Sequence, residues 1–259
     1  MDNQLVQHLE KLRLTHQRRL YALELQAASF GLSVPPHIVI EIEDIQDELA
    51  SIEAQIVEAN ISVPKFTIQP VLSILFLSAD PTDASRLRLG EELREIQEKL
   101  QLAKLRDRFE LHQRFSTRPT DMIQALLDVQ PQVVHFSSHG NASGALCFEN
   151  DLGRIHLIEP DTLAALFEQF VNQVNCVVLN ACYSEIQANV IAEHIKYVIG
   201  MNTIIGDKAA IAFSTGFYQA LGAGRTIEEA YKLGCVQIRL QGISEHLTPV
   251  LIQKGSIQP

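Results

Sequence analysis

The 259-residue chain has no long hydrophobic run and no excess of positive charge. No segment approaches the roughly 20 apolar residues that cross a bilayer, and charged residues interrupt residues 1 to 19 throughout. Acidic residues outnumber basic ones, 31 to 21, which gives a net charge of -10. Because nucleic acids and anionic membranes both attract basic surfaces, we expect neither as a direct partner. We expect a cytoplasmic protein.

Cysteine is scarce, with only four in the chain and none in C-x-x-C spacing. This excludes the usual zinc sites and disulfide frameworks, and it suits a reducing compartment. Three of the four lie in apolar segments and are expected to be small core residues: Cys147, Cys176 and Cys235. The fourth, Cys182, follows an apolar segment and is therefore a candidate for chemistry.

Common hydrolase and nucleotide-binding motifs are missing as well. G-x-S-x-G does not occur, so a serine nucleophile elbow is not supported. The turn at residues 78 to 83, after the first expected strand, contains no glycine, which argues against a dinucleotide cofactor. The glycine-containing residues 222 to 226 lack the phosphate-loop lysine and are expected to end one helix and start another. We expect no cofactor.

Two short apolar runs end in residues that carry reactive groups. Val133 to Gly140 reads VVHFSSHG, and Cys176 to Ser184 reads CVVLNACYS. Each is typical of a buried parallel strand that ends at a cleft. Because the carboxyl ends of neighbouring parallel strands share one crevice, we expect His139 and Cys182 to face the same groove.

A thiol beside an imidazole is the chemistry of a cysteine nucleophile. The thiolate is the reactive form, and a free cysteine with a pKa of ~8.5 is mostly protonated at neutral pH. His139 can take this proton and later deliver it to a leaving amine. The backbone N–H groups of Gly140 and Cys182 are candidates for an oxyanion hole, and Gly140 leaves room for a substrate.

The Ser-His-Gly and Asn-Ala-Cys sequences at these two strand ends resemble those of the CHAT peptidases, in the caspase and separase clan of cysteine proteases. The resemblance covers about residues 72 to 255. It implies a caspase-like α/β fold, with a mainly parallel six-stranded sheet flanked by helices. It also implies a catalytic pair of His139 and Cys182 that acts on a protein or peptide substrate.

Three polar residues could influence which substrate side chain is preferred. Asp80 ends the first expected strand, where enzymes of this clan place a residue of the pocket for the side chain before the cut bond. A buried carboxylate there would favour arginine or lysine, whereas the alternative is an ordinary turn residue. Metacaspase-like enzymes often carry an aspartate shortly before the catalytic cysteine, where this chain has Asn180. Asp207 is expected to cap a helix that starts at Lys208, with a pocket role as the alternative.

His135 and His139 form an H-x-x-x-H pair, which on a helix could share a zinc ion. On a strand, positions four apart are separated by roughly 13 Å, so the two rings cannot bind one metal. We interpret His135 as a hydrogen-bonded core residue, and we expect no metal site.

The remaining pattern alternates strands with helices, which predicts a doubly wound parallel sheet of about six strands. A hairpin is expected between residues 145 and 157. Strands are expected at residues 72–77, 109–115, 133–139, 176–179, 197–200 and 249–253, and helices at residues 86–104, 120–129, 160–170, 186–195, 208–221 and 226–240.

Residues 1 to 61 differ in character from the rest. Apolar residues three and four positions apart form one stripe from Leu5 to Phe30 and a second from Ile42 to Ile56. The double proline between them predicts an antiparallel two-helix hairpin, with a basic first and an acidic second helix. Residues 62 to 71 are expected to be a linker, and residues 72 to 259 the CHAT peptidase domain.

The hairpin buries too little surface to be stable alone, so it needs another surface to pack against. It is expected to be a brace or an adaptor for an activating protein partner, and it resembles helical N-terminal modules of bacterial effector proteins. We predict a partner-activated cysteine endopeptidase of bacterial signalling or defence, with cleavage after a basic residue as one option. Two alternatives stay open: a non-catalytic caspase-like scaffold recruited through the hairpin, and a small-molecule sensor.

Overall fold

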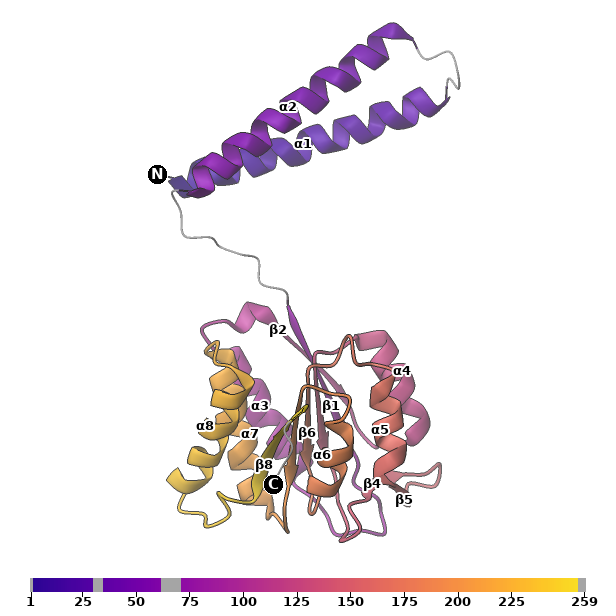
Figure 1. The fold of residues 1–259 in the computed structure, drawn as a ribbon, viewed down its shortest axis with the longest axis vertical. Helices are drawn as coiled ribbons and strands as arrows, with labels where there is room; N and C mark the ends of the chain where they lie inside the picture. The colour runs from indigo at the N-terminus through magenta and orange to yellow at the C-terminus, as the bar shows by residue number, and fades with distance from the viewer. Residues whose placement is uncertain (1, 30–34, 62–70, 256–259) are drawn as a thin grey trace. The chain divides into compact units, whose positions relative to one another are not determined.

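The computed structural model describes residues 2–29, 35–61 and 71–255. They divide into two compact units, Met1–Gln69 and Pro70–Pro259, which are treated separately (Figure 1). Phe30 and residues 62–70 of the expected linker lie outside the described residues, as do the side chains of Leu5 and Ile56. Within the described ranges, none of the helices combines the length and hydrophobicity that a bilayer crossing requires.

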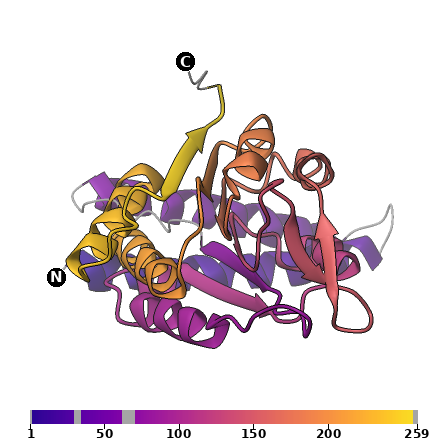
Figure 2. The same ribbon diagram turned by 90° about the horizontal axis from the view of Figure 1, so that it is seen from below.

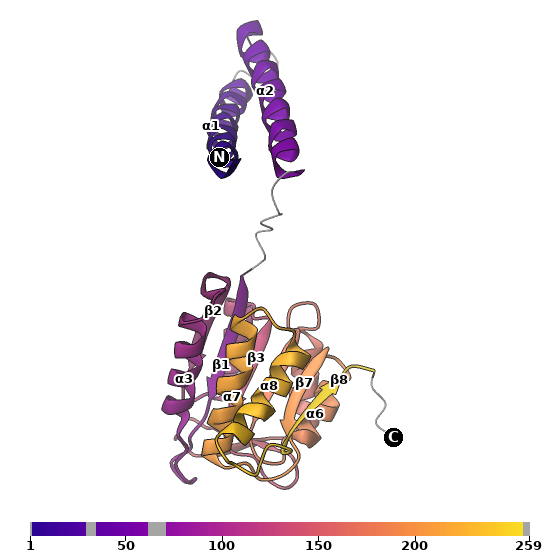
Figure 3. The same ribbon diagram turned by 90° about the vertical axis from the view of Figure 1, so that its left-hand side faces the viewer.

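The first unit consists of two helices, α1 (Asp2–Ser29) and α2 (Pro36–Ile61), which lie side by side (Figure 3). Leu9 contacts Ile52, and Leu23 packs with Ile38 and Ile45. Because early residues of α1 meet late residues of α2 and the reverse, the two helices are antiparallel. An exposed ion pair between α1 and α2 adds little to this packing: Arg19 with Glu41.

The second unit is built on a six-stranded sheet. The strands lie in the order β2 (Phe109–Arg114), β1 (Leu72–Ser78), β3 (Val133–Ser137), β6 (Cys176–Asn180), β7 (Tyr197–Met201) and β8 (Pro249–Gln253). All neighbours are parallel except β8, which is antiparallel to β7. A separate antiparallel hairpin is formed by β4 (Leu146–Glu149) and β5 (Ile155–Ile158). The predicted mainly parallel sheet is confirmed.

Helices cover both faces of this sheet (Figures 1 and 2). One face packs against α3 (Leu89–Gln101), α7 (Asp207–Gly222) and α8 (Ile227–Leu240), and the other against α4 (Pro119–Val129), α5 (Pro160–Glu168) and α6 (Glu185–Ile191). A short 3₁₀ helix, η1, spans Arg106–Arg108.

Strands between two helix layers are buried on both faces, which explains their nearly continuous apolar sequences. In β1, Ile74 and Phe76 face the α3 side, whereas Leu75 and Leu77 face the α4 side. β2 lies at the edge of the sheet and keeps exposed polar residues, in agreement with its alternating sequence.

Helix ends differ from the expected ones where local hydrogen bonds compete. The helix predicted from residue 86 starts at Leu89, because Arg86 and the Leu87 N–H both bind the Asp80 carboxylate. The expected cap at Asp207 is wrong, since α7 starts at that residue and its N-cap is Gly206. The break at residues 222 to 226 is confirmed, and its last residue, Thr226, caps α8.

Candidate active site

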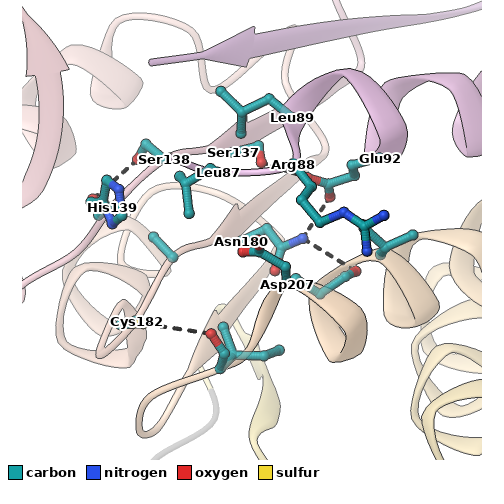
Figure 4. Close-up of a pocket in the computed structure, with 14 residues that line it drawn as sticks. Leu87, Arg88, Leu89, Glu92, Ser137, Ser138, His139, Asn180, Cys182 and Asp207 are labelled. Carbon is teal, nitrogen blue, oxygen red and sulfur yellow. Dashed lines mark hydrogen bonds between the residues drawn. The ribbon is translucent and has the colours of Figure 1, made fainter. Parts of the chain in front are cut away.

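The ends of β3 and β6 bring the predicted histidine and cysteine together. The two strands are neighbours, with Ser137 opposite Asn180 in register. His139 and Cys182 each lie two residues beyond the last residue of their strand, and both line one pocket (Figure 4). The arrangement is the expected one, in which two segments distant in sequence meet at the carboxyl edge of a parallel sheet.

His139 is oriented by a backbone carbonyl. Its Nε2 lies 2.7 Å from the carbonyl oxygen of Ser85, in the loop before α3. A carbonyl can only accept, so Nε2 carries a proton, and in the neutral ring Nδ1 is the free acceptor. Sequence reasoning missed Ser85, because a backbone carbonyl leaves no signature in the choice of side chain.

Cys182 sits in a tight turn braced by the loop after β7. Its half-buried Sγ lies 3.8 Å from the carbonyl oxygen of Ile205. The next residue, Tyr183, has a φ of 56°, in the left-handed region that is unfavourable for a bulky side chain. The Tyr183 N–H donates to the carbonyl of Thr203 at 3.2 Å. The turn that presents the thiol is therefore strained and held from the same loop.

The backbone at Gly140 touches the backbone at Cys182. A Cβ at position 140 would lie 2.1 Å from the Cys182 carbonyl oxygen, so only glycine fits there. Within the described parts of the chain, neither the N–H of Gly140 nor that of Cys182 donates a hydrogen bond. Two unpaired N–H groups beside a thiol are the donors that an oxyanion hole requires.

A buried carboxylate that sequence reasoning missed also lines this pocket. Glu92 on α3 is 3% exposed. It accepts hydrogen bonds from Ser137 Oγ at 2.5 Å, Asn180 Nδ2 at 2.5 Å and Ser214 Oγ at 2.6 Å. Burial by itself raises the pKa of Glu92, but hydrogen bonds from His135, Ser137 and Ser214 outweigh it and hold the pKa below its ordinary value. Glu92 is therefore ionised at neutral pH.

His135 belongs to the same hydrogen-bond network as Glu92. Its Nε2 lies 3.1 Å from Glu92 Oε1, and its Nδ1 lies 3.1 Å from the hydroxyl of Tyr218. The interpretation of His135 as a hydrogen-bonded core residue is confirmed. Among the residues that the structure describes, no three His, Cys, Asp or Glu side chains are grouped to hold a metal ion.

Asp80, for which the sequence left a pocket role and a turn role open, is not among the residues that line this pocket. Its Oδ2 is 2.8 Å from Arg86 Nη1, and its Oδ1 accepts from the Leu87 N–H at 3.4 Å. The carboxylate is thus engaged by two donors of its own loop, as a turn residue would be. Asp207 instead lines the pocket, and no described residue forms a hydrogen bond or ion pair with its carboxylate.

Sequence comparisons identify the family and several relatives of this chain. A family model described as CHAT domain matches residues 47–241, which include every element from β1 to α8. A Roc-COR-CHAT protease from an unknown prokaryotic organism is 26% identical over 166 residues, or 61% of this chain and 16% of that protein. A Roc-COR-CHAT protease from Runella zeae is 28% identical over 172 residues, or 64% of this chain and 18% of that protein. The chain thus spans less than a fifth of the length of these two relatives.

A solved structure shows the same fold. The crystal structure of caspase-1 from Spodoptera frugiperda superimposes with a TM-score of 0.51 at 13% identity, covering 74% of this chain and 91% of that one. At this identity the likeness establishes the fold alone, which is caspase-like. Since the family model matches well over half of the residues, the chain belongs to the CHAT domain family.

Proposed function

We propose that the chain is a cysteine endopeptidase in which Cys182 is the nucleophile and His139 the proton carrier. The observation that carries the proposal is that both side chains line one pocket, with the Nδ1 of His139 left as the acceptor. The names of the relatives, which are proteases, support the same reaction class.

The proposed mechanism uses backbone groups as well as side chains. His139 Nδ1 takes the thiol proton, the sulfur attacks the peptide carbonyl, and the developing oxyanion accepts from the N–H groups of Gly140 and Cys182. The imidazolium then protonates the leaving amine as the C–N bond breaks. Water hydrolyses the thioester with His139 as base. The Ser85 carbonyl accepts from Nε2 throughout and so stabilises the charged ring.

We further propose that the free chain is a resting form that a protein partner activates. The pocket offers only about 40 Å³, the space of a few water molecules, so a long substrate side chain needs the surrounding loops to move. The hairpin of α1 and α2 is the proposed receiver of the partner. It carries apolar side chains at its surface, among them Val39 and Ile40.

One observation favours the second candidate, a non-catalytic scaffold recruited through the hairpin. The Cys182 thiol contacts the Ile205 carbonyl, and within the described ranges it forms no hydrogen bond with His139. In this alternative the thiol does no chemistry and the hairpin supplies the function.

Labelling with a lysine-directed peptidyl acyloxymethyl ketone separates the two candidates. The peptidase account predicts an adduct on Cys182, detected by peptide mass mapping, that disappears in His139→Ala. Iodoacetamide, which needs no catalytic geometry, should alkylate Cys182 in both proteins. If the native chain forms no ketone adduct with any candidate partner present while iodoacetamide still reaches Cys182, the peptidase proposal is wrong.

A further inference from the structure

Asn180, two residues before Cys182, presents its side chain in one fixed orientation. Its Nδ2 lies 2.5 Å from Glu92 Oε1, 3.3 Å from the Ala210 carbonyl and 3.4 Å from Ser214 Oγ. A carboxylate and a carbonyl can only accept, so the nitrogen must face them (Figure 4). The oxygen of the same carboxamide therefore points away from Glu92, and Asn180 is one of the residues that line the pocket.

This oxygen is a buried acceptor without a donor. Asn180 is 4% exposed, and its Oδ1 has no hydrogen-bond partner among the described residues. Buried polar atoms are nearly always paired in folded proteins, so an unpaired one beside a nucleophile points to a group supplied by a ligand.

The charges around the pocket set the sign of that ligand. Glu92 is ionised behind Asn180, and the Asp207 carboxylate lines the pocket without an ion pair in the described part of the chain. Arg88, the N-cap residue of α3, also lines the pocket, but its guanidinium is already paired with Glu91 in the first turn of that helix. The Asp207 carboxylate and the unpaired carboxamide oxygen of Asn180 together favour a cation that donates hydrogen bonds.

We propose that this pocket selects a lysine or arginine side chain on the substrate residue before the cut bond. Asn180 Oδ1 and the Asp207 carboxylate are the acceptors, and Glu92 is the positioning residue that keeps the Asn180 oxygen turned to the pocket. An acidic side chain is rejected, because it would face the Asn180 oxygen and the negative charge of Asp207. The inference rests on the proposed function for its substrate. It assigns the preference for a basic side chain to Asn180 and Asp207 and not to Asp80.

The charge selectivity can be measured on the full chain without proteolysis. Aminoethyl and sulfonatoethyl methanethiosulfonate differ in charge and convert the same thiolate to a mixed disulfide, with methanesulfinate leaving. We expect the cationic reagent to modify Cys182 at least about tenfold faster than the anionic one. Peptide mass mapping over time measures both rates. Asp207→Asn and Asn180→Leu should each lower this ratio about threefold or more.

Asp161→Asn is the matched control. Asp161 lies in the first turn of α5, as Asp207 lies in the first turn of α7, but it does not line the pocket. The control should keep the native ratio. A native ratio of one or less, or an equal fall in Asp161→Asn, overturns the proposal. A fall in Asp80→Asn with no change in Asp207→Asn overturns it too, because the selecting carboxylate is then Asp80.

Peptide cleavage distinguishes this inference from the proposed function. If the native chain reacts faster with the cationic reagent as expected but cleaves no lysine or arginine peptide under any activating condition, the peptidase proposal is contradicted and the pocket assignment is upheld. A chain that cleaves after acidic or apolar residues contradicts the pocket assignment and upholds the peptidase. Asp207→Asn keeps the test valid even if Asn180→Leu does not fold, because Asp207 is only partly buried.

Discussion

At the scale of the residue, Glu92 links the stability of the domain to its candidate site. Its pKa in the folded chain lies below the ordinary 4.5, because hydrogen bonds from His135, Ser137 and Ser214 outweigh the effect of burial. A carboxylate whose pKa is lower in the folded chain than in the unfolded chain stabilises the fold at pH values above its unfolded-state pKa. This stabilisation is lost as the pH falls through its folded-state pKa. The free energy of unfolding should therefore decrease in acid, below about pH 4.5.

Glu92→Gln should lower the free energy of unfolding at pH 7 by about 1–3 kcal/mol, because charge-assisted hydrogen bonds become neutral ones. The acid-induced loss should be smaller in this variant than in the native chain. Denaturant titrations at pH 7 and pH 4 measure both effects. Glu98→Gln, an exposed position of the same helix, is the control and should behave like the native chain. Native stability and pH dependence in Glu92→Gln would show that the network contributes nothing.

Gly140→Ala tests the contact between the two strand ends. The added methyl carbon would lie 2.1 Å from the Cys182 carbonyl oxygen, so the backbone must shift and displace the two N–H donors. We predict a loss of about 10²–10³ in the rate of Cys182 acylation by a peptidyl probe, the range found when an oxyanion donor is removed. Circular dichroism should still report a folded domain. Acylation at the native rate would rule out these N–H groups as the oxyanion hole.

Sequence reasoning could name His139, Cys182 and Gly140 as candidates, because side-chain chemistry at the end of an apolar run is visible in the sequence. It missed Ser85, which acts through its backbone. It also missed Glu92, because α3 carries several glutamates, and only tertiary packing decides which one is buried. For Asp80 the sequence left a pocket role and a turn role open, because it does not show that two donors of the same loop bind the carboxylate.

At the scale of the element, α7 and α8 approach each other through glycine. A Cβ at Gly216 would lie 2.7 Å from the Leu233 carbonyl oxygen, a backbone atom that cannot easily move. We predict that Gly216→Ala lowers the free energy of unfolding by about 1–3 kcal/mol through overpacking. Gly90→Ala in α3 is the matched comparison, because nothing lies within 4 Å of the added carbon.

Gly90→Ala should raise the free energy of unfolding by about 0.4–1 kcal/mol, because alanine has less conformational freedom to lose in the unfolded chain. Denaturant titration of both variants gives the two signs. Equal effects of both substitutions would show that helix propensity, and not the contact between α7 and α8, decides the outcome.

The order of strands and helices could be predicted because double-sided burial and amphipathic faces leave periodic patterns. The positions where helices start could not, since they depend on non-local hydrogen bonds such as those of Asp80. The strand order was also beyond the pattern itself. Pairing β1 with both β2 and β3 is a tertiary choice that the periodicity of the sequence does not encode.

In the whole chain, the hairpin of α1 and α2 is the proposed partner-binding unit, and the caspase-like domain is the proposed catalytic unit. If a partner activates the chain through α1 and α2, full-length protein with that partner should cleave a lysine peptide at least about tenfold faster than residues 66–259 alone. This factor lies in the range of typical coupling between two sites of a protein. A fluorogenic peptide assay measures both rates. Equal rates would leave the hairpin as a brace without a regulatory role.

The proposed catalytic pair is His139, after β3, and Cys182, after β6, and a double-substitution cycle is the sharpest test of it. The values of kcat/KM for peptide cleavage are compared among the native chain, Cys182→Ser, His139→Ala and the double variant. Residues that act as a unit give a double variant no slower than the slower single one, and this is the result predicted. Losses that multiply, or native activity in His139→Ala, would contradict the account.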